Sequence, residues 1–369
     1  MGFVSKEKKL FTPGPLTTSK IVKESMLRDF GSRDLEFISS VKNVRERLLE
    51  LAKVKKDNYE AILMQGSGTF GIESVICSTV PSKGKLLVII NGAYGHRING
   101  IAKRLGIETI ELVYDEDSIP SLSDIDKTLA ENNGITNVAV IHCETTTGII
   151  NPILEIGRVV KKYGVEYIVD TMSSFGAYEI NVEENQIDFL ISSSNKCIEG
   201  VPGFSFIIAK TEVLKTKHHY SKSTSLDLYE QWMGLEKNGQ FRFTPPTHSI
   251  MAFQQALNEL YEEGGTLGRA NRYKKNHSVL TDGMAKLGFV EYIKRKNQGH
   301  IITSFLYPND KNFSFEKFYN LLNEKGLVIY PGKLSNVDCF RIGNIGQLFE
   351  TDMNEILGAI KEVKKEMNF

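Results

Sequence analysis

The chain has 369 residues, of which 41% are hydrophobic and 24% charged, an ordinary composition for a globular protein long enough for two domains. Its 45 basic residues are balanced by 45 acidic residues, so we expect neither nucleic acid nor an anionic membrane surface as a partner. No apolar run approaches the roughly 20 residues of a membrane span. Residues 1–11 lack the apolar stretch of a signal peptide and the four cysteines form no C-x-x-C pair, so we predict a cytoplasmic protein without a metal site.

Seven short apolar runs predict strands, and the amphipathic segments between them predict helices. The strands are expected at residues 59–64, 85–90, 109–113, 138–142, 167–170, 189–192 and 204–209. The helices between them are expected at residues 71–80, 96–105, 121–131 and 153–163. Near-continuous apolar strands separated by helices indicate an α/β fold with a mostly parallel sheet that is buried on both faces. The connection over residues 193–203 is too short for a parallel crossover, so the last strand is predicted to run antiparallel to the strand before it.

The pattern changes after about residue 210. Long helices are expected at residues 249–263 and 266–287, and a smaller α+β pattern follows. That pattern has strands at 300–306, 327–330 and 339–342 and helices at 314–325 and 352–365. We predict a large domain over residues 1–250, with an N-terminal arm at 1–15, and a small C-terminal α+β domain with its connecting helix over 251–369.

The segment 66–71 (GSGTFG) follows a predicted strand and opens a helix, which is formally the pattern of a dinucleotide-binding turn. A dinucleotide-binding site also needs an acidic residue at the end of the next strand. Asn91 and Gly92 occupy that place, so an NAD-binding site is disfavoured. Backbone amides at a helix N-terminus with two hydroxyl groups still suit a phosphate group. A simple glycine turn with a helix cap explains the segment equally well.

Polar groups follow three other strands of the predicted sheet. The segment 91–97 (NGAYGHR) places Tyr94 where it can stack on a flat ring, or simply cover the core. The segment 142–148 (HCETTTG) places a run of hydroxyl groups at a strand end; adjacent side chains alternate between faces and cannot all bind one metal ion. Asp170 ends another strand, and Lys196 comes just after the next one. Both therefore reach the carboxyl edge of the sheet, where α/β proteins bind ligands.

An aspartate and a lysine at that edge, beside a phosphate-binding turn, match the needs of pyridoxal 5′-phosphate. The carboxylate keeps the ring nitrogen protonated, and the amine forms a Schiff base. Lys196 alone would be taken for an exposed loop lysine, and Asp170 alone for a helix cap. Their combination with the segment 66–71 predicts a pyridoxal-phosphate enzyme.

The order of the motifs S-G-T, N-G-x-Y-G-x-R, E-T-T-T-G, V-D-x-x-S-S-x-G, S-x-N-K and R-I-G-N resembles the class V aminotransferases of fold type I. The resemblance extends from residue 11 to residue 344, and within the class it is greatest to the branch that acts on 2-aminoethylphosphonate and pyruvate. It implies a seven-stranded, mostly parallel sheet with one reversed strand, a small C-terminal domain, and a homodimer. It also implies transamination that yields phosphonoacetaldehyde and alanine.

Carried over by motif, the resemblance implies a role for each site residue. Lys196 and Asp170 are the catalytic pair. The residues implied in cofactor binding are Ser67, Gly68, Thr69, Tyr94, Thr145, Asp170, Ser173, Asn195, Lys196 and Thr247. Of these, Thr247 matches a residue that reaches the phosphate in the neighbouring subunit. Arg341 matches the arginine that clamps the acidic group of the substrate, and Arg33 is a second candidate for that group.

Several other functions compete with this interpretation. An alanine or serine aminotransferase of the same class, using glyoxylate or pyruvate, usually carries tryptophan where Tyr94 stands. A cysteine desulfurase needs a mobile nucleophilic cysteine, and the four cysteines lie on predicted helices and strands or next to Lys196. A catalytically inactive binding protein of this fold usually loses the lysine or the aspartate, and this chain keeps both. These comparisons favour the aminoethylphosphonate reaction.

Overall fold

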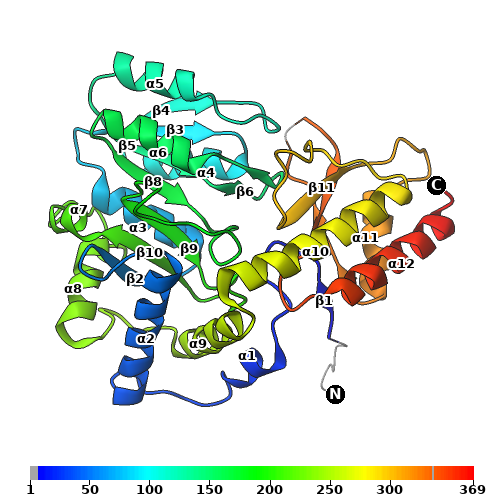
Figure 1. Cartoon of the computed structure of the whole chain (residues 1–369), viewed down its shortest axis with the longest axis horizontal. Helices are drawn as coiled ribbons and strands as arrows, with labels where there is room; N and C mark the ends of the chain where they lie inside the picture. Colours follow the sequence, from blue (N-terminus) through cyan, green and yellow to red (C-terminus); the bar gives the residue numbers. More distant parts are fainter. Residues whose placement is uncertain (1–6, 335) are drawn as a thin grey trace.

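The seven apolar runs form one sheet in the computed structural model, which describes residues 7–334 and 336–369 (Figure 1). Residues 1–6 of the predicted N-terminal arm lie outside the described residues. In spatial order the strands are β2 (Tyr59–Gln65), β10 (Phe204–Lys210), β9 (Phe189–Ser193), β8 (Glu166–Asp170), β5 (Ile135–Ile141), β3 (Lys85–Ile90) and β4 (Glu108–Val113). β10 runs antiparallel to both of its neighbours, β2 and β9, and the other strand pairs of this sheet are parallel, so the predicted reversal after the short connection is confirmed.

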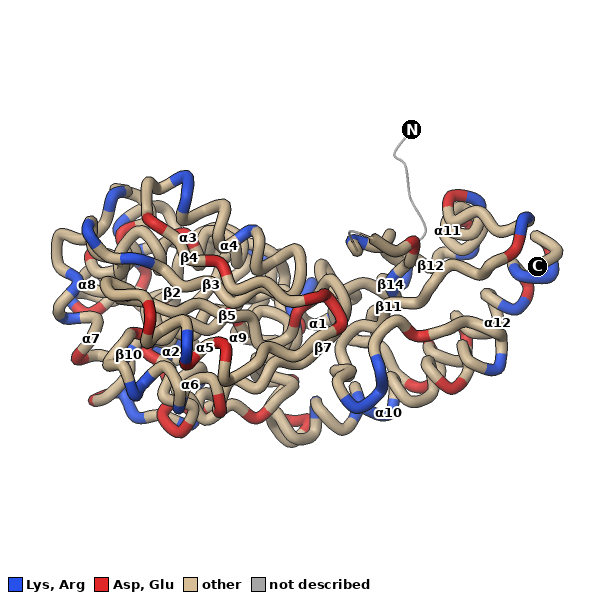
Figure 2. Tube along the Cα trace, turned by 90° about the horizontal axis from the view of Figure 1, so that it is seen from above, with Lys and Arg blue, Asp and Glu red and all other residues tan. Residues whose placement is uncertain are grey.

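Helices cover both faces of this sheet, as its apolar strands require. Figure 2 shows α3 and α4 on one side of the strands and α5 and α6 on the other. The bounds of these helices are α3 (Gly68–Thr79), α4 (Ala93–Arg104), α5 (Leu122–Glu131) and α6 (Ile153–Lys162). Both α3 and α4 begin three residues before the predicted starts at 71 and 96, so Tyr94 lies in the first turn of a helix and not in a loop.

Further helices complete the large part of the molecule. They are α1 (Lys20–Glu24), α2 (Leu35–Leu51), α7 (Thr211–Lys215), α8 (Leu228–Asn238) and α9 (Thr247–Glu262). A short hairpin, β6 (Cys143–Glu144) with β7 (Ile149–Ile150), follows β5. The buried apolar side chains of the sheet and of α2, α8 and α9 belong to one continuous core.

A second apolar core organises the C-terminal part, which lies to the right in Figure 1. The long helix α10 (Gly265–Lys286) runs from the large part into it. Its other elements are β11 (Ile302–Leu306), α11 (Phe315–Glu324), β12 (Leu327–Val328), β13 (Tyr330–Pro331), β14 (Cys339–Gly343) and α12 (Glu350–Met367). Phe11, which follows β1 (Lys9–Leu10), also packs in this second core. The division of the chain into domains 1–250 and 251–369 stays a prediction.

The single strand predicted at residues 327–330 is wrong, because this stretch contributes to two sheets. β12 pairs with β1 near the N-terminus, whereas β13 pairs with β14 at the edge of the three-stranded sheet β11-β14-β13. The buried Ile329 lies at the change of sheet. Pro331 lacks an amide hydrogen, and an edge position tolerates that loss.

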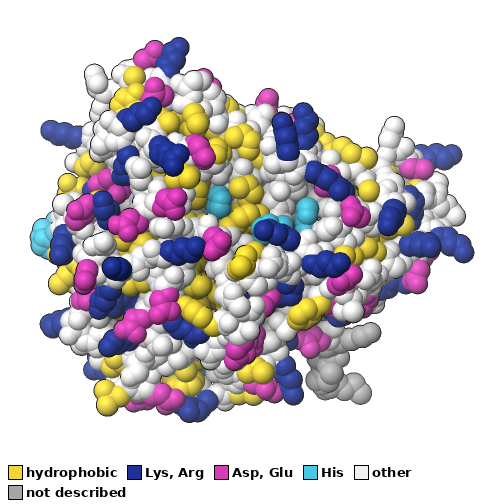
Figure 3. Space-filling view, viewed as in Figure 1, with side chains coloured by type: hydrophobic (Ala, Val, Ile, Leu, Met, Phe, Trp, Pro, Cys, Tyr) yellow, Lys and Arg dark blue, Asp and Glu magenta, His cyan; other side chains and the backbone are white. Residues whose placement is uncertain are grey.

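Charged side chains of both signs are mixed over the surface. Figure 2 shows Lys and Arg interspersed with Asp and Glu along the whole chain, and Figure 3 shows the same mixture on one face. This distribution agrees with the balanced charge of the sequence. Across residues 7–334 and 336–369, no helix combines the length and the hydropathy that a membrane crossing requires.

Candidate active site

Asp170 and Lys196 lie together at the carboxyl edge of the sheet. Asp170 is the last residue of β8 and faces Ile191 of the neighbouring β9 in the parallel ladder. Lys196 lies in the turn that follows Ser193, the last residue of β9. Two adjacent strands therefore bring an acid and an amine to one place, as the sequence predicts.

The surroundings of Asp170 suit a cationic partner. The residue is 5% exposed, and its Oδ1 accepts a hydrogen bond of 2.8 Å from the amide of Met172. Burial raises the pKa of the Asp170 carboxyl to about 7, and the nearby Lys196 and Arg97 act in the opposite direction. A positive group placed against Asp170 would therefore favour its ionised form.

The amino group of Lys196 is held by the N-terminal arm. Its Nζ donates a hydrogen bond of 2.6 Å to the carbonyl oxygen of Pro13. Gly14 lies against the same side chain: a Cβ at Gly14 would be 2.8 Å from Lys196 Cδ and 2.9 Å from Nζ. Gly14 also has a φ of +122°, a conformation that favours glycine. Burial lowers the pKa of Lys196 to about 8, so about a tenth of the amine is neutral at pH 7.

Buried charges fix the turn that carries Lys196. Arg269 of α10 donates a hydrogen bond of 2.7 Å to the carbonyl of Cys197. Glu199, 1% exposed, forms ion pairs with Arg272 at 2.8 Å and with Arg269 at 3.4 Å, and it also accepts a hydrogen bond from the hydroxyl of Tyr273. Breaking such a buried cluster leaves an unpaired charge, so the cluster holds the lysine turn against α10.

The predicted phosphate site lies at the start of α3. The first amides of a helix have no acceptor within the helix. At α3 the side chain of the N-cap residue, Ser67, does not supply one either. Gly68 lies so close to Met172 that a Cβ there would be 2.0 Å from the sulfur. Since Met172 also donates its amide to Asp170, the helix start and the carboxylate belong to one site. Free amides and the hydroxyls of Ser67 and Thr69 can bind a phosphate.

Tyr94 and Arg97, one helical turn apart on α4, lie beside this helix start. The guanidinium of Arg97 is 4.6 Å from the centre of the Tyr94 ring, and its Nη1 is 3.5 Å from the hydroxyl of Thr69. The sequence indicated a stacking role for Tyr94 and gave none to Arg97. The i,i+3 spacing of the two residues is the signal that could have linked them.

A chain of contacts joins the β8 turn to Arg341 on β14. The hydroxyl groups of Thr145 and Ser173 are 2.6 Å apart. Arg341, 2% exposed, donates from Nη1 to the carbonyl of Thr145 at 3.0 Å and from Nε to the carbonyl of Pro331 at 3.0 Å. These bonds fix the plane of the guanidinium and leave further N–H groups for an anion.

Three further residues are predicted for the site: Asn195, Thr247 and Arg33. The backbone of Asn195 approaches Gly14, where a Cβ would be 2.9 Å from the Asn195 oxygen. Thr247 opens α9, and its hydroxyl contacts only the neighbouring His248, at 3.4 Å, among the residues that the structure describes. Arg33 is exposed and lines a cavity of about 370 Å³ with residues 240–245. Within one chain, the structure does not bring Arg33 to Arg341.

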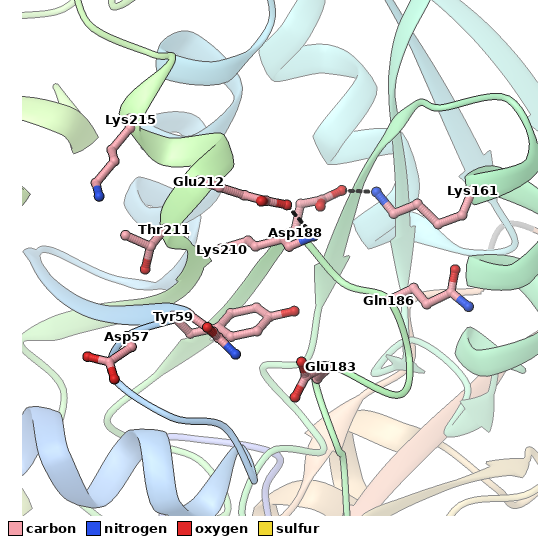
Figure 4. Close-up of a pocket in the computed structure, with 11 residues that line it drawn as sticks. Asp57, Tyr59, Lys161, Glu183, Gln186, Asp188, Lys210, Thr211, Glu212 and Lys215 are labelled. Carbon is pink, nitrogen blue, oxygen red and sulfur yellow. Dashed lines mark hydrogen bonds and ion pairs between the residues drawn. The ribbon is translucent and has the colours of Figure 1, made fainter.

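A larger cavity, of about 570 Å³, lies at the opposite edge of the sheet. Figure 4 shows its lining, which includes Tyr59 at the start of β2, Asp188 just before β9 and Lys210 at the end of the reversed β10. Asp188 pairs with Lys161 there. The residues predicted for the active site do not line this cavity, so its charged groups belong to the surface beneath the sheet.

Comparisons with known proteins show the family to which the chain belongs. The family model described as aminotransferase class-V matches residues 21–341. A relative from Bacillus cytotoxicus named 2-aminoethylphosphonate–pyruvate transaminase is 51% identical over 354 residues, which cover 96% of this chain and 97% of that protein. A relative of the same name from Phocaeicola vulgatus is also 51% identical, over 96% of this chain and 99% of the other.

Solved structures show the same fold at lower sequence identity. Ureidoglycine-glyoxylate aminotransferase from Bacillus subtilis has a TM-score of 0.91 at 22% identity, covering 100% of this chain and 96% of that one. Alanine–glyoxylate aminotransferase from Nostoc sp. has a TM-score of 0.90 at 20% identity, covering 98% and 97%. The expected fold type is confirmed. With the family model and the relatives at 51% identity, these findings show that the chain belongs to the class V aminotransferase family.

Proposed function

We propose that this protein transfers the amino group of 2-aminoethylphosphonate to pyruvate, giving phosphonoacetaldehyde and alanine. The observation that carries the proposal is the convergence of Lys196, Asp170 and the fixed guanidinium of Arg341 at one edge of the sheet. The names of the relatives that are 51% identical over nearly the whole chain support this choice of substrates.

The residues at this edge fit pyridoxal 5′-phosphate. The amides and hydroxyls at the start of α3 would hold the phosphate, together with Asn195, and Tyr94 would cover a face of the ring. Thr145 and Ser173 offer hydroxyls beside it. Among the described residues, the buried carboxyl of Asp170 accepts one hydrogen bond, from the amide of Met172, and a protonated ring nitrogen would complete this arrangement. When bound, the cofactor supplies a conjugated ring that stores the electron pair left after a substrate C–H bond loses its proton.

Lys196 would both anchor the cofactor and move the proton. Burial lowers the pKa of its amine to about 8, so the neutral base is accessible at physiological pH. The hydrogen bond to Pro13 O orients the amine, and the buried Glu199 cluster keeps its turn in place. A general base positioned in this way contributes about 100- to 10,000-fold to the rate of a proton transfer.

Arg341 would bind the acidic end of both substrates in turn. Its two hydrogen bonds to backbone carbonyls hold the guanidinium in one orientation, so its remaining N–H groups meet an anion without losing side-chain freedom. The phosphonate of the donor and the carboxylate of pyruvate then occupy one position. Sharing one anion site suits a reaction in which the first product leaves before the second substrate binds.

We further propose that the active unit is a homodimer with composite sites. Thr247 and Arg33 both lie near the loop of residues 240–245, away from Arg341 of their own chain, and both are at least partly accessible. Phe70 and Phe243 leave 50% and 46% of their surface exposed in the monomer. Apolar side chains that flank a site in this way are typical of a subunit contact. In this arrangement Thr247 reaches the phosphate in the partner subunit.

We place the reaction in the cytoplasm. All four cysteines are free and buried, which suits a reducing compartment.

The test is an amino-donor comparison with purified enzyme supplied with pyridoxal phosphate. Alanine formation from pyruvate is followed with 2-aminoethylphosphonate, serine or ethanolamine as donor. The proposal expects kcat/KM for the phosphonate to exceed that for the other donors by at least about 100-fold, since the Arg341 site would stay empty with ethanolamine. A preference for serine would instead support an alanine or serine aminotransferase of the same class.

A further inference from the structure

We propose that Lys333 is a specificity residue that binds the second negative charge of the donor's phosphonate group. The inference rests on the proposed function, because it concerns how one site accepts both substrates. Pyruvate carries a single negative charge on its carboxylate, whereas a phosphonate dianion carries two. One guanidinium at Arg341 matches the first anion, and the second needs another donor.

The hairpin between β13 and β14 places Lys333 next to Arg341. Tyr330 is the register partner of Arg341, and the guanidinium of Arg341 lies 5.8 Å from the centre of the Tyr330 ring. The Nε of Arg341 binds the carbonyl of Pro331 at 3.0 Å. The amide of Gly332 then donates to the carbonyl of Cys339 at 3.0 Å and closes the hairpin. Lys333 is the next residue, so its backbone is fixed relative to the substrate arginine.

The side chain of Lys333 extends from this hairpin toward the cofactor site. Its Nζ lies 5.1 Å from the centre of the Tyr94 ring on α4. Tyr94 is the residue that the proposed function places against the ring of the cofactor. Lys333 therefore reaches from the small C-terminal part of the molecule to Tyr94 in the first turn of α4, and Arg341 lies on β14 of the same hairpin.

Among the described residues, the Tyr94 ring is the one partner for the charge of Lys333. Within residues 7–334 and 336–369, its side chain forms no ion pair and no hydrogen bond, and the Tyr94 ring is its contact. Arg97, the other cation beside that ring, is engaged with the hydroxyl of Thr69 at the start of α3. Arg33 instead lines a cavity with residues 240–245 of the same chain. Among the described residues, Lys333 is thus a cation without an acidic partner that its own chain can bring to a ligand on Arg341, and its flexible stem allows that movement.

The experiment compares Lys333→Met with wild type, using the enzyme loaded with pyridoxal phosphate. Methionine keeps an unbranched apolar stem and removes the charge. Lys333→Arg restores a cation, and Lys311→Met removes an exposed charge from the loop between β11 and α11 as a control. The measurements are KM and kcat for each substrate, and the binding constants of ethylphosphonate and propanoate by calorimetry. These two ligands share the anionic end but lack the amine, so their binding does not depend on turnover.

We expect Lys333→Met to raise the KM for 2-aminoethylphosphonate and the Kd of ethylphosphonate by about 10- to 100-fold, the loss of one charge-assisted hydrogen bond. The KM for pyruvate and the Kd of propanoate should change less than about threefold. Lys333→Arg should recover most of the loss, and Lys311→Met should behave as wild type. Equal effects on phosphonate and carboxylate, or none on either, would overturn the assignment. Failure of wild type to use 2-aminoethylphosphonate would refute the proposed function, and the calorimetry would still decide the role of Lys333.

Discussion

The amino group of Lys196 donates a 2.6 Å hydrogen bond to the carbonyl oxygen of Pro13, although 183 positions separate them in the chain. The arm that carries Pro13 continues along the small part of the molecule, since Gly343 donates its amide to the carbonyl of Phe11 at 3.0 Å. A Cβ at Gly343 would lie 2.4 Å from the carbonyl oxygen of Thr12. The N-terminal arm therefore contacts both Lys196 and β14, the strand that carries Arg341.

This contact predicts that Gly14→Ala impairs catalysis directly. The new Cβ would meet Lys196 Cδ at 2.8 Å, and the φ of +122° is strained for alanine by about 1–3 kcal/mol. We expect kcat to fall at least about tenfold as the arm or the lysine moves. Gly106→Ala is the matched control, because Gly106 also has a positive φ, +68°, but has open space around it. If steady-state kinetics show the same kcat for both variants, the arm does not position Lys196.

Asp170→Asn should abolish most of the activity and preserve the fold. The amide oxygen of asparagine can still accept the hydrogen bond from Met172, so only the charge is removed. Losing a buried electrostatic partner of the reaction typically lowers kcat by about 100- to 1,000-fold. Asp188→Asn is the control, since Asp188 is 2% exposed but pairs with Lys161 at the opposite edge of the sheet (Figure 4). Asp188→Asn should lower the melting temperature and leave kcat nearly unchanged; the reverse pattern would be inconsistent with the role of Asp170.

The pKa of Asp170 also predicts how the stability of the cofactor-free protein depends on pH. Burial raises this pKa from an ordinary value of 3.8 to about 7. Between these values the folded protein holds a proton that the unfolded chain has lost, so the Asp170 contribution to stability falls as pH rises and stays low above 7. Asparagine has no such titration. The gain in unfolding free energy from Asp170→Asn, measured with denaturant, should therefore be larger at pH 8 than at pH 4, and a gain independent of pH would contradict the shift.

The proposed composite site predicts complementation between two defective subunits. Lys196→Ala removes the catalytic amine, and Thr247→Val removes the hydroxyl that would serve the partner's site. In a mixed dimer, the Thr247→Val chain supplies an intact Lys196, and the Lys196→Ala chain supplies an intact Thr247. If the two residues serve the same site, each mixed dimer should contain one site of wild-type composition. The assay uses differently tagged chains at limiting cofactor, because loss of one phosphate contact weakens binding by about tenfold. Mixed dimers no more active than the average of the two parent dimers would place Thr247 in the site of its own chain.

The sheet could be predicted because its strands are local apolar runs. Each of the seven strands contains a short, mostly apolar run, and the short connection before Phe204 revealed the one reversal. The prediction of one strand at residues 327–330 is wrong, because a run of apolar residues does not show that the chain changes sheets at Ile329. Neither α2 nor α8 was predicted from the sequence, although the buried residues of α2 recur with helical spacing.

Part of the site could also be predicted from local sequence patterns, and part could not. Asp170, Lys196 and the start of α3 follow from strand order, because parallel strands deliver their ends to one edge. The contacts of Arg97 with Thr69, of Lys333 with Tyr94 and of Lys196 with the Pro13 arm arise where distant segments pack together, and no local pattern encodes them. The position of Arg33 beside residues 240–245 likewise depends on how α2 and α9 pack.

The central claim is that Lys196 binds pyridoxal phosphate covalently, and one measurement tests it most directly. The purified enzyme is supplied with the cofactor and reduced with borohydride, and its peptides are analysed by mass spectrometry. We expect the pyridoxyl phosphate group on the peptide that contains Lys196, and its absence from Lys196→Ala. The group on another lysine, or wild-type protein without any stable label, would contradict the account.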